Sequence, residues 1–189
     1  MEKIIIASNN QGKIIEFKNL LGNQFNAVSM MEYGIEIDIA ETGTSFVENA
    51  IIKAQIIYQQ TNCAVIADDS GLCIDALGGL PGIKSARFVS DHDNETNIMG
   101  VLDKMKKYTN RNAQFVCAIA YINKSGKLIT AQGETKGHIA YKKIGENGFG
   151  YDSIFIADEL GITFAQATFE QKQMTSHRVK ALQNLIVQL

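Results

Sequence analysis

Several features that often mark a protein's class are scarce in this sequence. It has no tryptophan, one proline and three cysteines among 189 residues. A single proline argues against a proline-rich hinge between domains. Cys63, Cys73 and Cys117 are widely spaced, form no CxxC pair, and lie apart from the three histidines. A zinc site and a disulfide framework are therefore poor interpretations, and we expect reduced thiols.

Long apolar runs and an excess of positive charge are missing as well. No run approaches the roughly 18 apolar residues that cross a bilayer, and the first residues, MEKIIIASNN, lack the pattern of a signal peptide. The formal net charge is −2, and there is no basic stripe of the kind that binds nucleic acid. We therefore expect a cytoplasmic protein with no nucleic acid and no membrane as partner. An anionic ligand would be held by a few focused lysines and arginines.

The apolar residues that are present, and their spacing, indicate a globular mixed α/β fold. Apolar residues make up 46% of the chain and charged residues 20%, and the length suits one domain over residues 1–189. Strand patterns cover residues 3–7, 64–67, 114–122, 127–133, 137–142 and 153–157, with a turn at 123–126; helical patterns cover 13–21 (ended by Gly22), 45–54 (capped by Ser45), 94–108 and 176–189 (capped by Ser176). Strands alternate with helices early and pair as hairpins late, which argues against a purely parallel sheet.

The first stretch that could carry chemistry is ASNNQGK, residues 7–13. A strand, a polar turn and a lysine at a helix start favour anion binding, because helix N–H groups point at the anion and Lys13 adds charge. The stretch is not a Walker A loop, which needs a second glycine and a hydroxyl after the lysine. A capped helix with a solvated lysine explains it equally simply.

The second stretch, ETGTSFVENAIIKA, covers residues 41–54. Ser45 and Glu48 have the spacing of a capping box. Asn49 and Lys53 lie one turn apart on the same helix face, and Glu41 stands just before the turn. Read alone, the stretch also fits a capped helix with a solvated Lys53.

The third stretch, VIADDSGLCIDALGGLPG at residues 65–82, holds two adjacent carboxylates at the expected end of a buried strand. Neighbouring side chains in an extended chain point to opposite faces, so Asp68 and Asp69 need separate partners. A carboxylate at the C-terminal end of a strand suits a hard cation such as Mg²⁺. A polar turn with a capping aspartate is the alternative.

Two later stretches could recognise a flat or anionic ligand. GENGFGYDS, residues 145–153, has glycines that permit close backbone approach, and Phe149 could stack on a base or sit in the core. EQKQMTSHR, residues 170–178, places His177 and Arg178 on the first turn of the last helix, with Lys172 upstream. Cations there oppose the helix dipole, and a local rule broken without local gain is a hint of function. Ordinary surface residues are the alternative.

Taken in order, the motifs ASNNQGK, ETGTSFVENAIIKA, IADDSGL, LGGLPGIKSARF, ENGFGYD and QMTSHR resemble the inosine triphosphatase family, the ITP/XTP/dITP pyrophosphatases. The match runs from about residue 4 to residue 182, nearly the whole chain. The resemblance implies an elongated two-lobed fold around a mixed twisted β-sheet with flanking helices, with the active site in the cleft between the lobes. It also implies a Mg²⁺-dependent homodimer that hydrolyses ITP, dITP and XTP to the nucleoside monophosphate and pyrophosphate, which cleanses the nucleotide pool.

The resemblance also implies roles for individual residues. Asp69 would be the catalytic proton acceptor for the attacking water, and Glu41 and Asp69 would be the metal ligands. The substrate-binding residues would be Ser8, Asn9, Asn10, Gln11, Gly12, Lys13, Lys53, Ser70, Phe149, Gly150, Tyr151, Asp152, Lys172, His177 and Arg178. Asp68 is left with a supporting or structural role. Lys84 is a departure, since the family often has an aromatic residue there.

Base choice would depend on hydrogen bonding, because hypoxanthine and xanthine present a 6-oxo acceptor and an N1–H donor where adenine reverses the pattern. A pocket built around O6 can reject adenine by about 10⁴-fold because its buried groups are left unpaired. His177 and Arg178 are the candidates for O6 recognition. Two other functions remain open at this point: a nucleotide-binding sensor without turnover, and a pyrophosphatase for other modified nucleotides.

Overall fold

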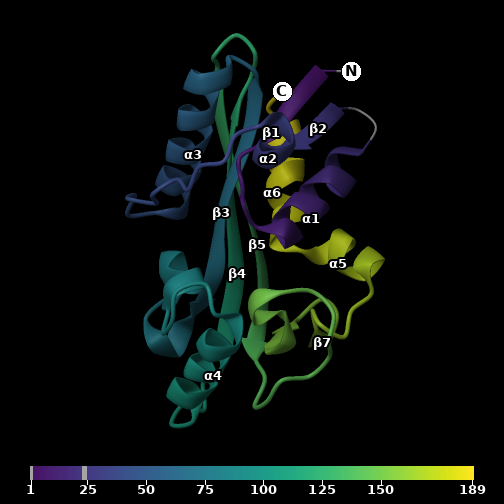
Figure 1. Cartoon of the computed structure of the whole chain (residues 1–189). Helices are drawn as coiled ribbons and strands as arrows, with labels where there is room; N and C mark the ends of the chain where they lie inside the picture. The colour runs from purple at the N-terminus through teal and green to yellow at the C-terminus, as the bar shows by residue number, and fades with distance from the viewer. Residues whose placement is uncertain (1, 23–24) are drawn as a thin grey trace. The chain divides into compact units, whose positions relative to one another are not determined.

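The computed structural model describes residues 2–22 and 25–189, and Figure 1 shows the order of its elements. The strands are β1 (Glu2–Ile6), β2 (Phe25–Ser29), β3 (Ala64–Ile74), β4 (Asn112–Ile122), β5 (Leu128–Ile139), β6 (Phe155–Ala157) and β7 (Ile162–Thr163). The α-helices are α1 (Gln11–Leu21), α2 (Met30–Tyr33), α3 (Phe46–Thr61), α4 (Asn94–Met105), α5 (Phe169–Thr175) and α6 (His177–Ile186). Short 3-10 helices are η2 (Asp75–Leu77), η3 (Gly82–Arg87) and η4 (Gly150–Ser153).

Within the described residues, seven strands form one sheet in the order β2-β1-β3-β4-β5-β6-β7. β1 is parallel to both β2 and β3, whereas β6 is antiparallel to both β5 and β7. The predicted mixed α/β class is therefore confirmed.

The chain divides into two compact units. Unit 1 comprises the described residues up to Asp69, together with Cys117–Gly133 and Ala181–Leu189. Unit 2 comprises Ser70–Val116 and Glu134–Lys180. Each unit is assembled from separate segments of the chain, so residues far apart in the sequence share one core.

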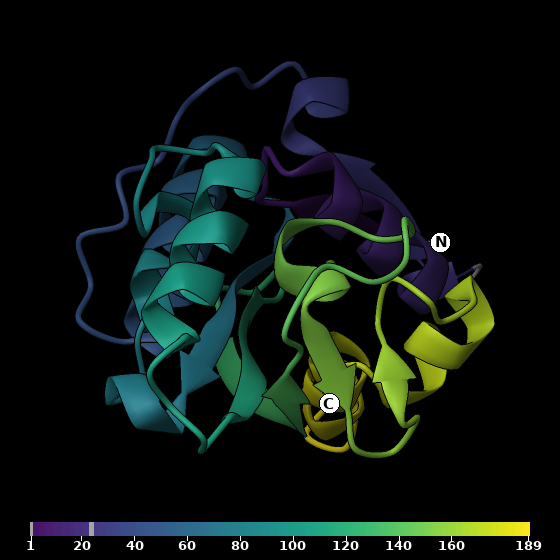
Figure 2. The same cartoon turned by 90° about the horizontal axis from the view of Figure 1, so that it is seen from below.

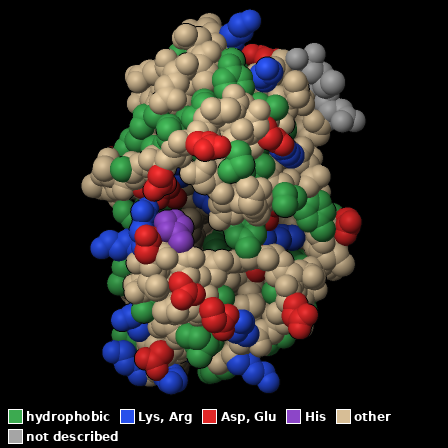
Figure 3. Space-filling view, viewed as in Figure 1, with side chains coloured by type: hydrophobic (Ala, Val, Ile, Leu, Met, Phe, Trp, Pro, Cys, Tyr) green, Lys and Arg blue, Asp and Glu red, His purple; other side chains and the backbone are tan. Residues whose placement is uncertain are grey.

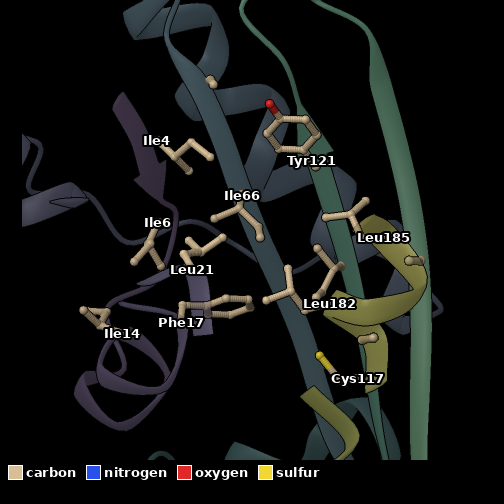
Figure 4. Packing of buried hydrophobic residues seen from close by; sticks show 14 residues of the cluster. Ile4, Ile6, Ile14, Phe17, Leu21, Ile66, Cys117, Tyr121, Leu182 and Leu185 are labelled. Carbon is tan, nitrogen blue, oxygen red and sulfur yellow. The ribbon is translucent and has the colours of Figure 1, made fainter. Parts of the chain in front are cut away.

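Unit 1 has a hydrophobic cluster on each face of its strands. On one face α1 and α6 contribute Phe17 and Leu182, which pack with Ile66 and Cys117 (Figure 4). On the other face α3 packs against Val65 and Ala67 of β3. Even-numbered and odd-numbered residues of β3 therefore face different helices, as the two-residue period of a strand requires.

Unit 2 is built around a cluster of aromatic and aliphatic side chains. Helix α4, the teal helix in Figures 1 and 2, contributes Ile98, Val101 and Met105 to it. Phe115 and Phe155 lie edge to face there, with ring centroids 4.7 Å apart. The predicted helical spacing of this segment is confirmed, although the helix ends at Met105 and not at residue 108.

Helix starts follow from side-chain caps that the sequence shows. The amide oxygen of Asn10 accepts the backbone N–H of Lys13 at 3.1 Å, so α1 begins at Gln11, two residues before its predicted start. Ser45 accepts from the backbone of Glu48, but the Glu48 carboxylate turns to Thr44 instead of closing a capping box. Ser176 accepts from the backbone of Val179 and so caps α6, which ends at Ile186.

Two strands are longer than predicted. Asp68, Asp69 and Gly71 lie inside the 11-residue β3, which was predicted to end at residue 67. The strand continues because both carboxylates have partners inside the protein. The predicted strands at 127–133 and 137–142 are one strand, β5, whose second half alternates buried and exposed residues without a break. The predicted turn at 123–126 is confirmed by the hydrogen bond from Gly126 N–H to the Asn123 carbonyl.

The surface charges and the helices agree with the low net charge and the short apolar runs of the sequence. On the face shown in Figure 3, acidic and basic side chains are interspersed. Among the described residues, no helix combines the length and the apolar content needed to cross a bilayer.

Candidate functional site

The turn after β1 is held in a defined conformation by its own polar side chains. The Asn9 amide donates to the carbonyl of Ile37 at 3.0 Å, and the Asn10 N–H donates to the Ser8 hydroxyl at 3.2 Å. Gln11, Gly12 and Lys13 form the first turn of α1, which carries no acidic side chain. A helix start of this kind presents N–H groups and the positive end of the helix dipole to an anion.

The two adjacent carboxylates of β3 point to opposite faces, as predicted from strand geometry. Asp68 lies on the α1 side, where its Oδ2 is 3.1 Å from Lys13 Nζ. Asp69 lies on the α3 side, where its Oδ2 accepts from the Asn49 amide at 2.9 Å. Both residues are buried, at 1% and 5% exposed. The two carboxylates therefore make different contacts, although the charges of both act on Lys53.

Helix α3 presents Asn49 and Lys53, one turn apart, to these carboxylates. Lys53 is buried and its Nζ lies 2.5 Å from Glu41 Oε1. Burial by itself would lower the pKa of Lys53, but the negative charges of Asp68, Asp69 and Glu41 outweigh it and hold that pKa above its usual value. Lys53 is therefore a fixed cation, and the alternative of a solvated lysine is wrong.

Asp69 is electrostatically distinct from an ordinary surface aspartate. Removal from water raises its pKa, and the repulsion of Glu41 adds to this effect. Lys53, Lys13 and the Asn49 hydrogen bond offset only part of the rise. A carboxylate in this state is a stronger base than a solvated one, which suits it to accept a proton from water.

In unit 2, Asp152 organises the glycine-rich segment. Its Oδ2 receives Lys172 Nζ at 2.6 Å and the backbone N–H of Phe149 at 2.9 Å. The Lys172 ammonium lies 4.7 Å from the centroid of the Phe149 ring, so one cation contacts both a carboxylate and an aromatic face. Gly148 has φ +75°, and a Cβ there would meet the Asp152 carboxylate at 2.1 Å, so only glycine fits.

His177 and Arg178 are buried at the start of α6, at 4% and 1% exposed. The alternative of ordinary surface residues is therefore wrong. Arg178 Nη2 donates to the Ser70 hydroxyl at 2.9 Å. The His177 ring stacks on Phe115 with centroids 4.8 Å apart and planes 12° apart. Both side chains are held in defined positions within unit 2.

Tyr151 has an internal partner for its polar group. The residue is buried, and its hydroxyl donates to the carbonyl of Ser85 at 2.8 Å. Burial raises the pKa of the Tyr151 phenol, so it stays neutral. Ser85 in turn accepts the Leu72 N–H through its hydroxyl. Lys84, the departure from the family pattern, is exposed in η3.

Comparison with known proteins places the chain in a family. A family model described as the Ham1 family matches residues 4–188. The chain belongs to the Ham1 family. The predicted family membership is thus confirmed.

Individual Ham1-type relatives cover nearly the whole chain. A dITP/XTP pyrophosphatase of Staphylococcus aureus (strain MRSA252) is 44% identical over 96% of this chain and 93% of its own length. A dITP/XTP pyrophosphatase of Bacillus subtilis (strain 168) is 43% identical over 98% of this chain and 96% of its own. The solved structure of a HAM1 protein from Coxiella burnetii has a TM-score of 0.88 at 37% identity, over 99% of this chain and 98% of that one. The Ham1 fold follows from this likeness.

Some contacts in this Ham1 chain have no signal in the sequence. Phe115, which stacks on His177, and Ser85, which receives Tyr151, had no local signal because their contacts join distant segments. Asn49 had a signal, its one-turn spacing from Lys53, but its partner was not predictable. The Lys13 contact of Asp68 likewise depends on how α1 packs on β3.

Oxygen ligands for a cation are available in unit 1. No group of three or more His, Cys, Asp or Glu side chains suited to a metal occurs among the described residues. Glu41 and Asp69 nevertheless lie close enough for each charge to affect the other. Magnesium is commonly bound by one or two carboxylates together with substrate phosphates and water. The donor set therefore fits Mg²⁺ that arrives with a nucleotide.

Proposed function

We propose that this chain hydrolyses dITP, ITP and XTP to the nucleoside monophosphate and pyrophosphate, and so removes deaminated purines from the nucleotide pool. The observation that carries the proposal is the buried Asp69 with its raised pKa, set among Asn49, Lys53 and Glu41 in unit 1. The two dITP/XTP pyrophosphatases that are 44% and 43% identical over nearly the full length support the same reaction.

The triphosphate would be bound by residues of unit 1. The turn from Ser8 to Gly12 and the start of α1 offer backbone donors, and Lys13 and Lys53 offer charge. Lysines that are already placed need little reorganisation when negative charge develops on the departing pyrophosphate. This is the contribution expected of fixed cations in phosphoryl chemistry.

Asp69 would accept the proton of the water that attacks the α-phosphorus. In the metal-free protein its pKa is raised, chiefly by burial, so this carboxylate is a stronger base than a solvated one. Asn49 donates to one carboxylate oxygen, Oδ2, and so orients the carboxylate. Proton transfer then requires that the water lie within about 3 Å of the Asp69 carboxylate.

Glu41 and Asp69 would hold Mg²⁺ together with the phosphates. When bound, the ion polarises the phosphate oxygens and lowers the pKa of coordinated water. Glu41 pairs with Lys53 in the structure described here, so Lys53 neutralises that carboxylate when no cation does. Removal of divalent cations should abolish turnover, and added Mg²⁺ should restore it.

Residues of unit 2 would recognise the base. His177 and Arg178 are the residues proposed to recognise O6. Arg178, like the nearby Lys172, carries hydrogen-bond donors and no acceptors, so it suits the 6-oxo group of hypoxanthine or xanthine and not the 6-amino group of adenine. The Phe149 ring, which already contacts the Lys172 cation, would stack on the base. Ser70, His177 and the backbone of Gly150 to Asp152 would complete the contacts.

The test is a product assay. Purified protein is incubated with Mg²⁺ and with dITP, ITP, XTP, dGTP or ATP, and the products are resolved by ion-exchange chromatography. We expect the nucleoside monophosphate with pyrophosphate, and dITP, ITP and XTP preferred over ATP; the dGTP rate measures whether the 2-amino group of guanine is also rejected. Release of orthophosphate with the diphosphate would refute the proposed reaction. Tight dITP binding without hydrolysis at any Mg²⁺ or Mn²⁺ concentration would instead indicate a sensor.

The resemblance to the family also supports a homodimer as the working form. Light scattering coupled to size-exclusion chromatography measures the mass directly, and a mass of one chain at micromolar concentration would contradict this part of the proposal.

A further inference from the structure

The contacts of Asp68, which the reaction proposed above does not use, give this residue a specific task. Its side chain is completely buried, yet its Oδ2 lies 3.1 Å from Lys13 Nζ, and the Lys13 side chain is only 14% exposed. An ion pair so well shielded from water is screened much less than a surface pair. The direction of the Lys13 side chain is therefore set by Asp68.

The surroundings of Asp68 explain why it can hold a lysine so firmly. Ala64 and Ile66 on the same face of β3 belong to the cluster formed with α1 and α6, and Cys117 belongs to it as well. The Cys117 thiol lies 3.8 Å from the same Asp68 Oδ2 and is positioned to donate to it. The packing of β3 in this cluster and the Cys117 contact thus keep the Asp68 carboxylate in one position.

Both the backbone and the side chain of Lys13 are held in place. Its backbone N–H is bound by the Asn10 cap, and its ammonium is bound by Asp68. Lysine on the first turn of a helix is disfavoured by the helix dipole, and a nearby carboxylate offsets that effect. The sequence therefore places a cation in an unfavourable position and compensates for it with a buried anion.

We propose that Asp68 is the positioning residue for Lys13. This inference rests on the proposed function, in which Lys13 contacts the triphosphate. Without Asp68, the lysine side chain would sample several rotamers, and substrate binding would have to order it at an entropic cost. Asp68 removes that cost before the nucleotide arrives. Adjacent carboxylates of β3 therefore serve two groups: Asp69 the attacking water and Asp68 the lysine.

The test is a double-mutant cycle between the two residues. Steady-state kcat and KM for dITP are measured in wild type, Asp68→Asn, Lys13→Met and the double variant. In the wild-type background, Asp68→Asn should lower kcat/KM by about tenfold or more, the scale of one charge-assisted hydrogen bond. In the Lys13→Met background, the same change should lower kcat/KM clearly less, since contacting residues are not additive and the loss that remains comes from the Asp68 charge acting on Lys53. An equal loss in both backgrounds would overturn the inference, as would wild-type kinetics for Asp68→Asn.

A second measurement needs no substrate and separates this inference from the proposed function. Proton–nitrogen NMR spectra of lysine ammonium groups are recorded on the ligand-free protein, and Lys13→Met identifies the Lys13 signal. An ammonium held by a buried carboxylate exchanges slowly, so the signal should be visible in wild type and lost in Asp68→Asn. An unchanged signal would overturn the inference. Absent dITP hydrolysis in wild type would refute only the proposed function.

Cys117 supplies a matched pair of milder variants for the case in which Asp68→Asn does not fold. Cys117→Ser keeps a donor toward Asp68, whereas Cys117→Ala removes it. We expect the Lys13 signal to persist in the serine variant and to weaken in the alanine variant. Loss of the signal in both, or in neither, would count against the role of the Asp68 carboxylate in holding Lys13.

Discussion

Single side chains in this protein are specialised by the face of the strand on which they lie. Asp68 and Asp69 are neighbours in sequence, but one faces α1 and the other faces α3. Two like charges side by side therefore make different direct contacts. The alternation of a strand gives each charge separate partners, which is why both can be buried without facing each other.

Asp69→Asn should abolish most turnover and preserve the fold. Asparagine has the same shape and can still accept from the Asn49 amide, but it cannot take a proton from water. General-base catalysis contributes about 10²–10⁴-fold, so kcat should fall by about 10³-fold. Steady-state kinetics with dITP measures this, and circular dichroism checks the fold. Near wild-type kcat would refute the assignment of Asp69 as the base.

The same variant should be more stable than wild type at neutral pH. The pKa of Asp69 is raised in the folded protein, chiefly by burial, so the folded state binds this proton more tightly than the unfolded chain does. The stabilising contribution of this carboxyl is therefore complete below its unfolded pKa and is lost as the pH rises through its folded pKa. Asp69→Asn avoids that loss.

Denaturant unfolding at a series of pH values checks this prediction. The stability gain of Asp69→Asn should be present at pH 7 and should shrink as the pH falls toward about 4, the ordinary range of an aspartate. A gain that is independent of pH would show that the substitution acts by packing and not by charge.

At the scale of elements, a run of polar residues does not always form a turn. The run DDSG looked like the end of a strand, but it lies inside β3, because the Asp68 and Asp69 side chains are satisfied by Lys13 and Asn49 from two helices. In β5 the alternation of buried and exposed residues continues across two glycines, so the strand is not interrupted there. In both strands, contacts with other parts of the fold outweigh the local preference for a turn.

Three elements of unit 2 are joined through Ser85, and this connection can be tested. The Ser85 carbonyl receives the Tyr151 hydroxyl, and its own hydroxyl receives the Leu72 N–H and donates to Gly82. Tyr151→Phe should cost about 1–2 kcal/mol, because a carbonyl loses its donor. Ser85→Ala should cost about 1–3 kcal/mol, because the Leu72 N–H loses its acceptor.

Urea unfolding followed by circular dichroism measures both variants. Tyr141→Phe is the matched control, since Tyr141 is 82% exposed and its ring still lies over Arg111 after the change. The control should stay within about 0.5 kcal/mol of wild type. Equal effects of Tyr151→Phe and Tyr141→Phe would show that the Tyr151 hydrogen bond contributes nothing.

At the scale of the whole molecule, each unit is assembled from separated segments. Unit 1 takes in the second half of β4, the first half of β5 and most of α6, in addition to the N-terminal part. The residues that gather around Asp69 all come from the N-terminal part, whereas those around Arg178 come from both ends of unit 2. Such assembly depends on chain topology, which local periodicity does not encode.

The charge of the whole chain predicts weak interaction with nucleic acid. Its formal net charge is −2, and acidic and basic side chains are interspersed on the face in Figure 3. Non-specific DNA binders reach dissociation constants of about 10⁻⁴–10⁻⁶ M at physiological salt. Fluorescence anisotropy with a labelled duplex should show no saturable binding in that range. Salt-sensitive micromolar binding would contradict the prediction.

The sequence by itself determined the mixed α/β class, the order of motifs that identifies the family, and the separation of Asp68 from Asp69. These follow from composition, motif order and the two-residue period of a strand, none of which depends on how the elements pack. Only the tertiary structure decided that Lys13 pairs with Asp68, Lys53 with Glu41 and Arg178 with Ser70. Each of these contacts joins residues from different segments of the chain, and the packing of those segments sets the distance between them.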